Sequence, residues 1–215
     1  MVQNHDPKLA NSQLRLTLIA MQQVIGEKSS QEIIKKLDIG IDLANLPPED
    51  FDLTFPARDY AKLSTAIETT YGSRSAQILS RIGRSTFHQV LREQPNWMSS
   101  ARRTMGMWKP ARRAALILEA IIDSQQKTYP HSESWIEKKN GQISYIEQNC
   151  VVCFGRVASS PVCFLKTGFL SEAVRWATDK EFNFQETACI AAGDPYCRFL
   201  LNTNRPNQQA STNPQ

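Results

Sequence analysis

Hydrophobic residues recur at helical spacing through the first two thirds of the chain. Leu14, Leu18 and Met21 lie on one face of a predicted helix that Ser12 can cap and Gly26 can end. A loop is expected to separate the second helix from the third over residues 40–54. The further predicted helices begin at Ser29 (in a capping box with Glu32), Pro56, Ser73 and Pro110, and they end before Gly40, Gly72, Pro95 and Pro130.

The period of the pattern changes after Ser132. Asn140-Gly141 is a strong signal for a two-residue hairpin, here between strands at 135–138 and 143–146. Helices followed by antiparallel strands predict an α+β fold, in which N-terminal helices pack on a C-terminal antiparallel sheet. The remaining expected elements are strands at 150–157, 182–191 and 196–201 and a helix at 163–178.

Composition is that of one globular domain. Hydrophobic residues make up 41% of the 215 residues and charged residues 21%, so the chain can bury a core. We expect a single domain at 12–203, with disordered polar tails at 1–11 and 204–215. The longest apolar run, 114–122, is too short for a membrane span. The N-terminus has no apolar signal-peptide core, so we expect a cytoplasmic protein.

All five cysteines lie between Cys150 and Cys197. An odd number of cysteines in one segment is not typical of the disulfide frameworks of secreted domains. The clustering therefore indicates either a metal site or buried thiols.

Three of these cysteines and one carboxylate have the spacing of a metal site. Cys189 and Cys197 flank a predicted turn, Glu186 precedes Cys189 by three residues, and Cys163 precedes a helix. Three thiolates and a carboxylate would complete a tetrahedral zinc site. Glu186 and Cys189 have opposite parity in a regular strand, so this interpretation requires a bulge near 187–188. The alternative from spacing alone is a set of buried cysteines that pack as small hydrophobic residues.

The segment 161–199 resembles a known family. It reads PVCFLKTGFLSEAVRWATDKEFNFQETACIAAGDPYCRF and is similar to the 4-vinyl-reductase-type domain, with a Cys before a Gly-Phe-bearing helix, then Glu-x-x-Cys and Ala-x-Gly-Asp-x-x-Cys-x-Phe. That domain occurs in the sensor modules of aromatic-responsive activators such as XylR and DmpR. It also occurs in BchJ-like stand-alone proteins of phototrophs, and its fold is shared with TRAPP subunits.

The resemblance implies a zinc site, a fold and a quaternary state. In the sensor modules the matching Cys, Glu, Cys, Cys set binds structural zinc, which here implies Cys163, Glu186, Cys189 and Cys197 as ligands. Related domains pair through their helices, which implies a homodimer. Cys150 and Cys153 fall outside the motif, and on one strand their side chains would point to two faces, so we interpret them as core thiols.

A ligand pocket is the second feature that the resemblance implies. In the family, an apolar pocket between helices and sheet holds an aromatic or other hydrophobic molecule. The imidazole of His88 could ligate the magnesium of a chlorophyll-type pigment in such a pocket, hydrogen-bond to the backbone or lie at the surface. The same side chains could instead simply fill the core. The candidate pocket residues are Phe87, His88, Trp97, Met105, Trp108, Trp135, Tyr145 and Phe154.

Positive charge is concentrated between Arg74 and Arg113, a segment with nine basic residues and a single acidic residue, Glu93. Such a segment can be a solvated helical face, or it can attract an acidic protein or an anionic membrane surface. No helix-turn-helix or zinc-finger pattern supports nucleic-acid binding. The residues of the candidate basic surface are Arg81, Arg84, Arg102, Arg103, Arg112 and Arg113.

These observations favour a non-catalytic binding module for a hydrophobic small molecule. No Gly-x-Gly-x-x-Gly or Walker sequence indicates a nucleotide cofactor, so we do not expect an enzyme. The resemblance to stand-alone proteins of phototrophs implies a tetrapyrrole or chlorophyll precursor, in pigment synthesis or photosystem assembly. The alternatives are a ligand-free interaction subunit and a sensor of aromatic compounds that acts through a partner.

Overall fold

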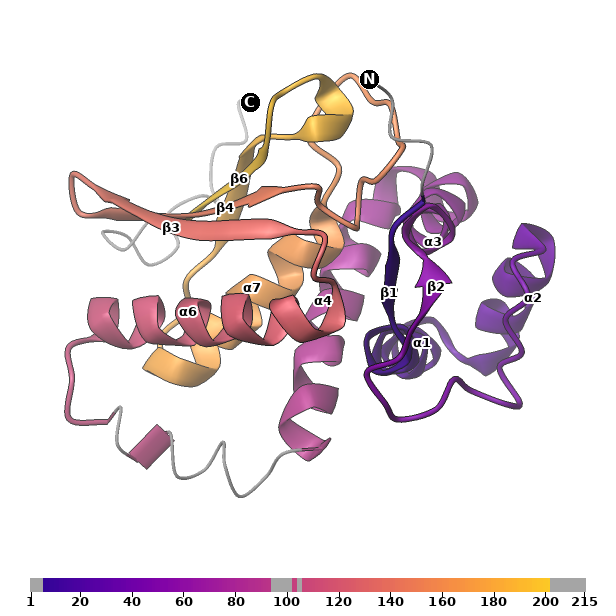
Figure 1. The fold of residues 1–215 in the computed structure, drawn as a ribbon, viewed down its shortest axis with the longest axis horizontal. Coiled ribbons are helices and arrows are strands. Elements are labelled where there is room, and N and C mark those ends of the chain that lie inside the picture. The colour runs from indigo at the N-terminus through magenta and orange to yellow at the C-terminus, as the bar shows by residue number, and fades with distance from the viewer. Residues whose placement is uncertain (1–5, 94–101, 104–105, 202–215) are drawn as a thin grey trace, which may run out of the picture.

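The computed structural model describes residues 6–93, 102–103 and 106–201. A four-stranded antiparallel sheet lies over two helices, and a helical part with a small two-stranded sheet lies beside them (Figure 1). This arrangement is the predicted α+β class. None of the helices in the described part of the chain combines the length and the apolar character that crossing a bilayer requires.

Residues 8–10 form a strand and residue 11 begins the first helix, which corrects the predicted disordered tail for this part of 1–11. Strand β1 (Lys8–Ala10) pairs antiparallel with β2 (Leu53–Pro56). Leu9 is completely buried between this pair and the helices, so the strand belongs to the core. Three residues are too few for a hydrophobic period to be visible in the sequence. Residues 1–5 and 202–215 lie outside the described ranges.

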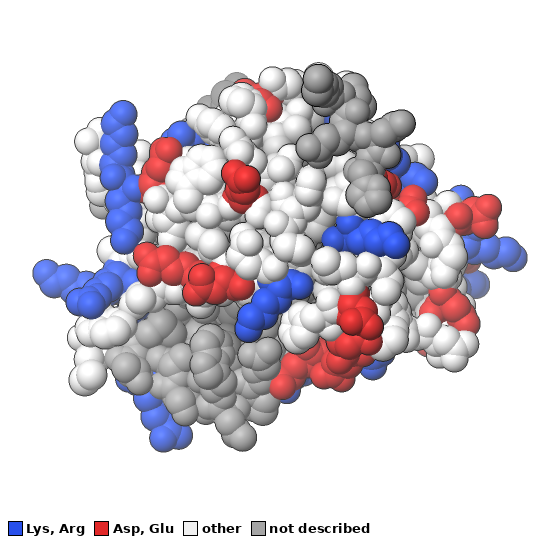
Figure 2. All heavy atoms as spheres, viewed as in Figure 1, with Lys and Arg blue, Asp and Glu red and all other residues white. Residues whose placement is uncertain are grey.

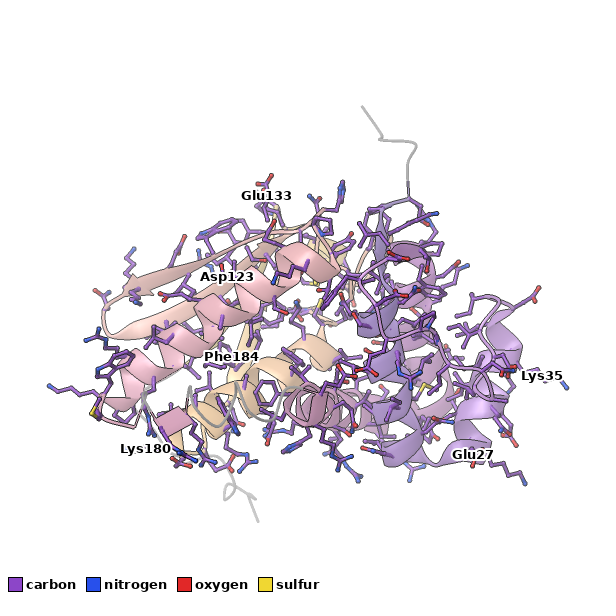
Figure 3. All side chains as sticks on the ribbon, turned by 60° about the horizontal axis from the view of Figure 1, so that its bottom comes forward. Glu27, Lys35, Asp123, Glu133, Lys180 and Phe184 are labelled. Carbon is purple, nitrogen blue, oxygen red and sulfur yellow. The ribbon has the colours of Figure 1, made fainter. Side chains whose placement is uncertain are left out.

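The first helices follow the predicted pattern, with one change at a cap. Gly26 adopts φ +83° between the first two helices, a conformation that glycine tolerates. The second helix therefore begins at Glu27, and Ser29 lies inside it instead of capping it. This helix lies at the edge of the molecule, with Glu27 and Lys35 at its two ends (Figure 3). The three helices are α1 (Asn11–Ile25), α2 (Glu27–Leu37) and α3 (Ala57–Tyr71).

Two glycines allow α4 and α7 to cross in direct backbone contact. A Cβ added at Gly83 would lie 1.9 Å from the carbonyl oxygen of Leu165, and one added at Gly168 would lie 2.0 Å from that of Ser80. Any side chain would separate the helices, so these positions set the interhelical distance. The bounds of the later helices are α4 (Ser75–Glu93, after a 3₁₀ turn at Gly72–Arg74), α6 (Pro110–Thr128) and α7 (Phe164–Thr178).

The sheet has the order β3-β4-β6-β5, and every pair is antiparallel. The predicted hairpin is present, with Asn140 at φ +51° and Gly141 at φ +75°. The predicted strand at 150–157 is wrong, because Asn149 at φ +55° ends β4 and the following residues form turns. The strands are β3 (Glu133–Lys139), β4 (Gln142–Gln148), β5 (Phe184–Ala188) and β6 (Cys197–Leu201).

Candidate metal centre

Three separate chain segments bring the four predicted zinc ligands together. Cys163 is the N-cap residue of α7, Glu186 is in β5, and Cys197 is the first residue of β6. Cys189 follows β5 directly and leads into a short 3₁₀ turn. The register of β5 against β6 is irregular between Glu186 and Ala188, which is where the parity of the sequence requires a bulge.

The separations of the sulfur atoms match the edges of a coordination tetrahedron. Cys163 Sγ lies 3.8 Å from Cys189 Sγ and 4.0 Å from Cys197 Sγ. A tetrahedral ion with Zn–S bonds of about 2.3 Å places its ligands about 3.8 Å apart. Ligand atoms of Cys163, Glu186, Cys189 and Cys197 all lie within 4.8 Å of one another. The predicted set therefore forms a geometrically suitable metal site, without a disulfide among the five cysteines.

Glu186 carries a buried oxygen that suits a cation. Its Oε2 accepts a hydrogen bond from the backbone N–H of Cys163 at 2.7 Å. Its Oε1 is buried and has no hydrogen-bond partner, which is costly for a polar atom unless another group binds it. Burial, and then the neighbouring Cys189, raise the pKa of Glu186 to about 8. A metal ion among the thiols would satisfy the unpaired oxygen.

Cys150 and Cys153 are buried in the core, as predicted, but both also face this site, whereas the predicted strand would point them to two faces. Cys150 Sγ lies 3.9 Å from Cys163 Sγ, and Cys153 Sγ lies 3.5 Å from Cys197 Sγ. Because the segment turns instead of running as a strand, both side chains point to the same place. Hydrogen bonds from neighbouring thiols, Cys153 first, lower the pKa values of Cys150 and Cys189.

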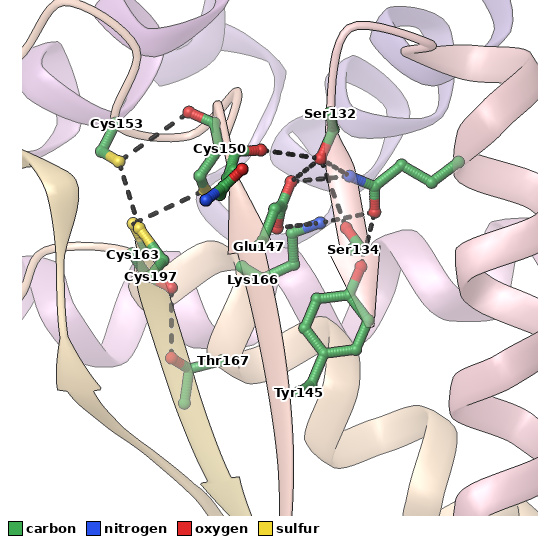
Figure 4. A network of polar contacts seen from close by, with 12 residues as sticks. Ser132, Ser134, Tyr145, Glu147, Cys150, Cys153, Cys163, Lys166, Thr167 and Cys197 are labelled. Atoms are coloured by element: carbon green, nitrogen blue, oxygen red, sulfur yellow. Dashed lines mark hydrogen bonds and ion pairs between the residues drawn. The ribbon is translucent and has the colours of Figure 1, made fainter. Parts of the chain in front are cut away.

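A buried polar network adjoins the thiols, and the sequence analysis did not predict it (Figure 4). The ammonium of Lys166 lies 3.0 Å from a carboxylate oxygen of Glu147, and both side chains are nearly inaccessible to solvent. Gln125 donates to Glu147 at 2.6 Å and accepts from the hydroxyl of Tyr145 at 2.7 Å. Burial raises the pKa of Glu147 to about 7. Glu147 and buried Tyr145 lie two residues apart in β4 and therefore point to the same face of the sheet. This alternation is the sequence signal that could have placed Glu147 in the core.

The segment that contains the metal centre matches a known family model. Residues 145–203 match the model of the 4-vinyl-reductase-type domain. This match confirms the resemblance carried by the sequence of 161–199. The uncharacterized protein MJ0855 of Methanocaldococcus jannaschii is 31% identical over 65 residues, which are 29% of this chain. The aligned part covers 28% of the length of that relative.

Solved structures of H-NOX proteins share the fold over most of the chain, including residues beyond the segment 145–203 that the family model matches. A mutant H-NOX protein from S. oneidensis in the Fe(II) ligation state has a TM-score of 0.60 at 10% identity, covering 94% of this chain and 100% of its own. The Fe(II) unliganded H-NOX protein from K. algicida has a TM-score of 0.58 at 10% identity, with the same coverage. At this identity the similarity shows the fold alone. The likeness to TRAPP subunits stays a prediction.

The predicted pocket residues are dispersed and do not line one cavity. Phe87 is buried between α4 and α7, where its ring contacts Phe169 and Trp176. Tyr145 is buried and packs on Phe199. Elsewhere, Trp135 stacks edge-on with Tyr196, Trp108 lies under the guanidinium of Arg112, and Trp97 and Met105 lie outside the described residues.

Of the predicted set, Phe154 is the one described residue that lines a separate surface cavity. This cavity is a groove of about 840 Å³ between α2, α3 and the segment that follows Cys153. One wall is formed by residues 154–158 and Val162. In the sequence these residues lie between two of the clustered cysteines, Cys153 and Cys163. The predicted pocket between the helices and the sheet stays a prediction, and the groove beside α2 and α3 is a second candidate that the sequence did not indicate, because core aromatics and groove aromatics look alike in a sequence.

His88 does not face an apolar pocket, contrary to one of the predicted possibilities. Its Nε2 lies 2.9 Å from a carboxylate oxygen of Glu172, and its side chain is 46% exposed. Glu172 lies on α7 and is almost fully buried, and Arg84 and Arg175 also bind it. The site around His88 is a surface ion-pair network between α4 and α7.

The basic segment is partly neutralised by acidic residues of α7 and the residue after it. Arg84 pairs with Glu172, and Arg102 and Arg113 both pair with Asp179. On the face drawn in Figure 2, acidic and basic side chains are interspersed. In addition, Arg112 stacks on Trp108, whereas Arg81 and Arg103 are exposed. The predicted basic surface therefore has fewer unpaired charges than the sequence suggests.

The Glu172 network predicts a pH-dependent stability. Although burial opposes ionisation, the hydrogen bonds from Arg175 and the positive charges around Glu172 lower the pKa of its carboxyl below the ordinary 4.5. A carboxyl with a lowered folded-state pKa stabilises the fold above pH 4.5, and this contribution is lost as the pH falls through the folded-state value. Glu172→Gln should remove the contribution at pH 7. The urea unfolding midpoints of the wild type and Glu172→Gln should then differ at pH 7 and converge toward pH 3. A difference between the midpoints that stays constant with pH would contradict this expectation.

Proposed function

We propose that this chain is a non-catalytic binding module for a hydrophobic small molecule of the tetrapyrrole class, with zinc as a structural metal. The observation that carries the proposal is the groove beside the thiol cluster. Its volume of about 840 Å³ lies within the range of about 300–1,000 Å³ typical of small-molecule sites. It is open at the surface, so a large planar molecule could enter without unfolding a helix.

The lining of the groove favours an apolar molecule that carries acidic groups. Ile33, Leu37 and Phe154 offer apolar surface on its walls, and Val157 is 96% exposed at its edge. An exposed apolar side chain beside a groove is typical of a surface that a ligand covers. Basic side chains of Lys36, Arg58, Lys62 and Arg156 also line the groove. Within the chain, Arg58 pairs with Asp6, Lys62 with Asp59 and Arg156 with Glu68. A tetrapyrrole acid would place its ring system on the apolar walls, and its carboxylates would pair with Lys36 or compete for these cations.

The similar proteins support the same ligand class. H-NOX proteins of similar fold include one studied for heme distortion, and heme is a tetrapyrrole. The family match supports a role related to that of the 4-vinyl-reductase-type domain. We propose that the function lies in pigment synthesis or photosystem assembly, in a cytoplasmic protein that acts as a homodimer.

Zinc would stabilise the wall of the groove. Cys163, Glu186, Cys189 and Cys197 would hold the ion between the start of α7, the end of β5 and the start of β6. An ion with four protein ligands has no open position for water or substrate, so it stabilises the fold and takes no part in chemistry. This is the reason for proposing binding instead of catalysis.

Filling the groove should weaken ligand binding without unfolding the chain. Thr65 is exposed on α3 and lines the groove. Thr65→Trp is expected to weaken binding of protoporphyrin IX at least about tenfold, or about 1.4 kcal/mol, measured by fluorescence titration. Ser124→Trp, at an exposed site on α6 away from the groove, is the matched control and should bind as the wild type does. Equal binding by both variants, or no binding by the wild type, would favour the ligand-free interaction subunit.

A further inference from the structure

We propose that the thiol cluster is a binuclear metal site, with Cys150 and Cys153 as terminal ligands of a second ion. This inference rests on the metal site of the proposed function but not on the groove ligand. The sulfur atoms of Cys150, Cys153, Cys163 and Cys197 lie within 4.8 Å of one another, as do the donor atoms of the set that contains Glu186 and Cys189. The described residues thus contain two complete sets of four donors.

The two sets share Cys163 and Cys197 and differ in the other two members. The shared sulfur atoms are 4.0 Å apart, close to the separation of about 3.8 Å between two ligands of one tetrahedral zinc ion. A thiolate sulfur has enough lone pairs to bind two ions. With Zn–S bonds of about 2.3 Å, two ions that shared an edge of 4.0 Å would lie only about 2.3 Å apart. Binding of the second ion must therefore draw the sulfur atoms of Cys163 and Cys197 closer together, which moves the two ions apart. Cys150 and Cys153 then complete one tetrahedron, and Glu186 and Cys189 complete the other.

The contacts of the outer ligands agree with this division. Cys150 and Cys189 each approach the shared Cys163, at 3.9 Å and 3.8 Å between sulfur atoms. Cys153 approaches the other shared sulfur, that of Cys197, at 3.5 Å. A single four-coordinate ion would leave two of these six buried donors without a metal. Two ions would use all six, including the unpaired Oε1 of Glu186.

The surroundings can accommodate the negative charge of such a site. Five thiolates and one carboxylate carry more negative charge than two divalent ions neutralise. Cys163 is the N-cap residue of α7, a helix of 15 residues, and the positive end of a helix dipole favours a thiolate there. The backbone N–H of Ile190 donates to Cys197 Sγ at 3.5 Å. Both bridging sulfur atoms therefore have a positive partner besides the ions. On binding, each thiol releases its proton to solvent.

Paired variants separate the two halves of the site. We expect two zinc ions per wild-type chain by native mass spectrometry and elemental analysis. Cys150→Ser/Cys153→Ser should hold one ion in the Glu186 half, and Glu186→Gln/Cys189→Ser should hold one ion in the Cys150 half. Val152→Ala, at a buried residue of the same turn that offers no ligand, is the matched control and should keep two ions.

A cobalt titration of the wild-type chain tests the stoichiometry without any variant. Thiolate-to-cobalt absorption should rise until two equivalents of Co²⁺ are bound. An end point at one equivalent would overturn the binuclear site. If that single ion survives Cys150→Ser/Cys153→Ser, the zinc set of the proposed function still stands. If it instead survives only Glu186→Gln/Cys189→Ser, the ligand set of the proposed function is wrong as well.

Discussion

Cys197→Ser is expected to release the bound metal and to leave the chain largely unfolded at neutral pH. Cys197 belongs to both donor sets and is fully buried at the start of β6. Binding energy at a structural zinc site is also folding energy and amounts to about 10–16 kcal/mol in small zinc domains. This is as large as the whole stability of a typical domain, about 5–15 kcal/mol. Circular dichroism and urea unfolding, with zinc content measured in parallel, check this expectation.

The metal-free wild type is the control for this variant. Because a serine hydroxyl is close in size to a thiol, the packing change is small compared with the loss of the ion. Wild-type protein stripped of metal by a chelator should therefore be about as unstable as Cys197→Ser, and adding zinc should rescue only the wild type. Full zinc content in Cys197→Ser would show that Cys197 is not a ligand, and unchanged unfolding of the stripped wild type would show that the thiols are ordinary core residues.

Gly168→Ala is expected to destabilise the fold by about 2 kcal/mol, the cost of overpacking less the gain in helix propensity. In an isolated helix the same change would be stabilising by about 1 kcal/mol, because alanine has the higher helix propensity. Here the added Cβ would lie 2.0 Å from the backbone oxygen of Ser80, and backbone cannot move aside as a side chain can. The helices must separate, and overpacking of this kind costs about 1–3 kcal/mol or more. The free energy of unfolding by urea measures the sum.

Two companion variants isolate the helix crossing. Gly83→Ala meets the carbonyl of Leu165 from the other helix and should be destabilising to a similar degree. Gln77→Ala, at an exposed site on α4, should change the free energy of unfolding by less than about 0.5 kcal/mol. A stabilised Gly168→Ala would mean that α4 and α7 do not cross in backbone contact.

Local sequence signals predicted most elements, because they depend on neighbouring residues alone. The Asn140-Gly141 hairpin and the start of α6 at Pro110 follow from backbone preferences that act within a few residues. The bulge near Thr187 followed from the opposite parity of Glu186 and Cys189, given that both were predicted to bind one ion. Local signals were insufficient for β1, because three residues gain their stability from a partner strand more than forty residues away.

The helical first part and the antiparallel second part could be predicted from patterns along the chain, and the family resemblance added four candidate donor residues of the metal centre. That Cys150 and Cys153 lie beside those candidate donors became visible only in the packed structure, since a turn instead of a strand directs both sulfur atoms to one place. The packed structure also placed the groove beside α2 and α3 and paired His88 with Glu172. The physical reason is distance along the chain: periodicity assigns a side chain to a face, but the packing of separate segments decides what it meets there.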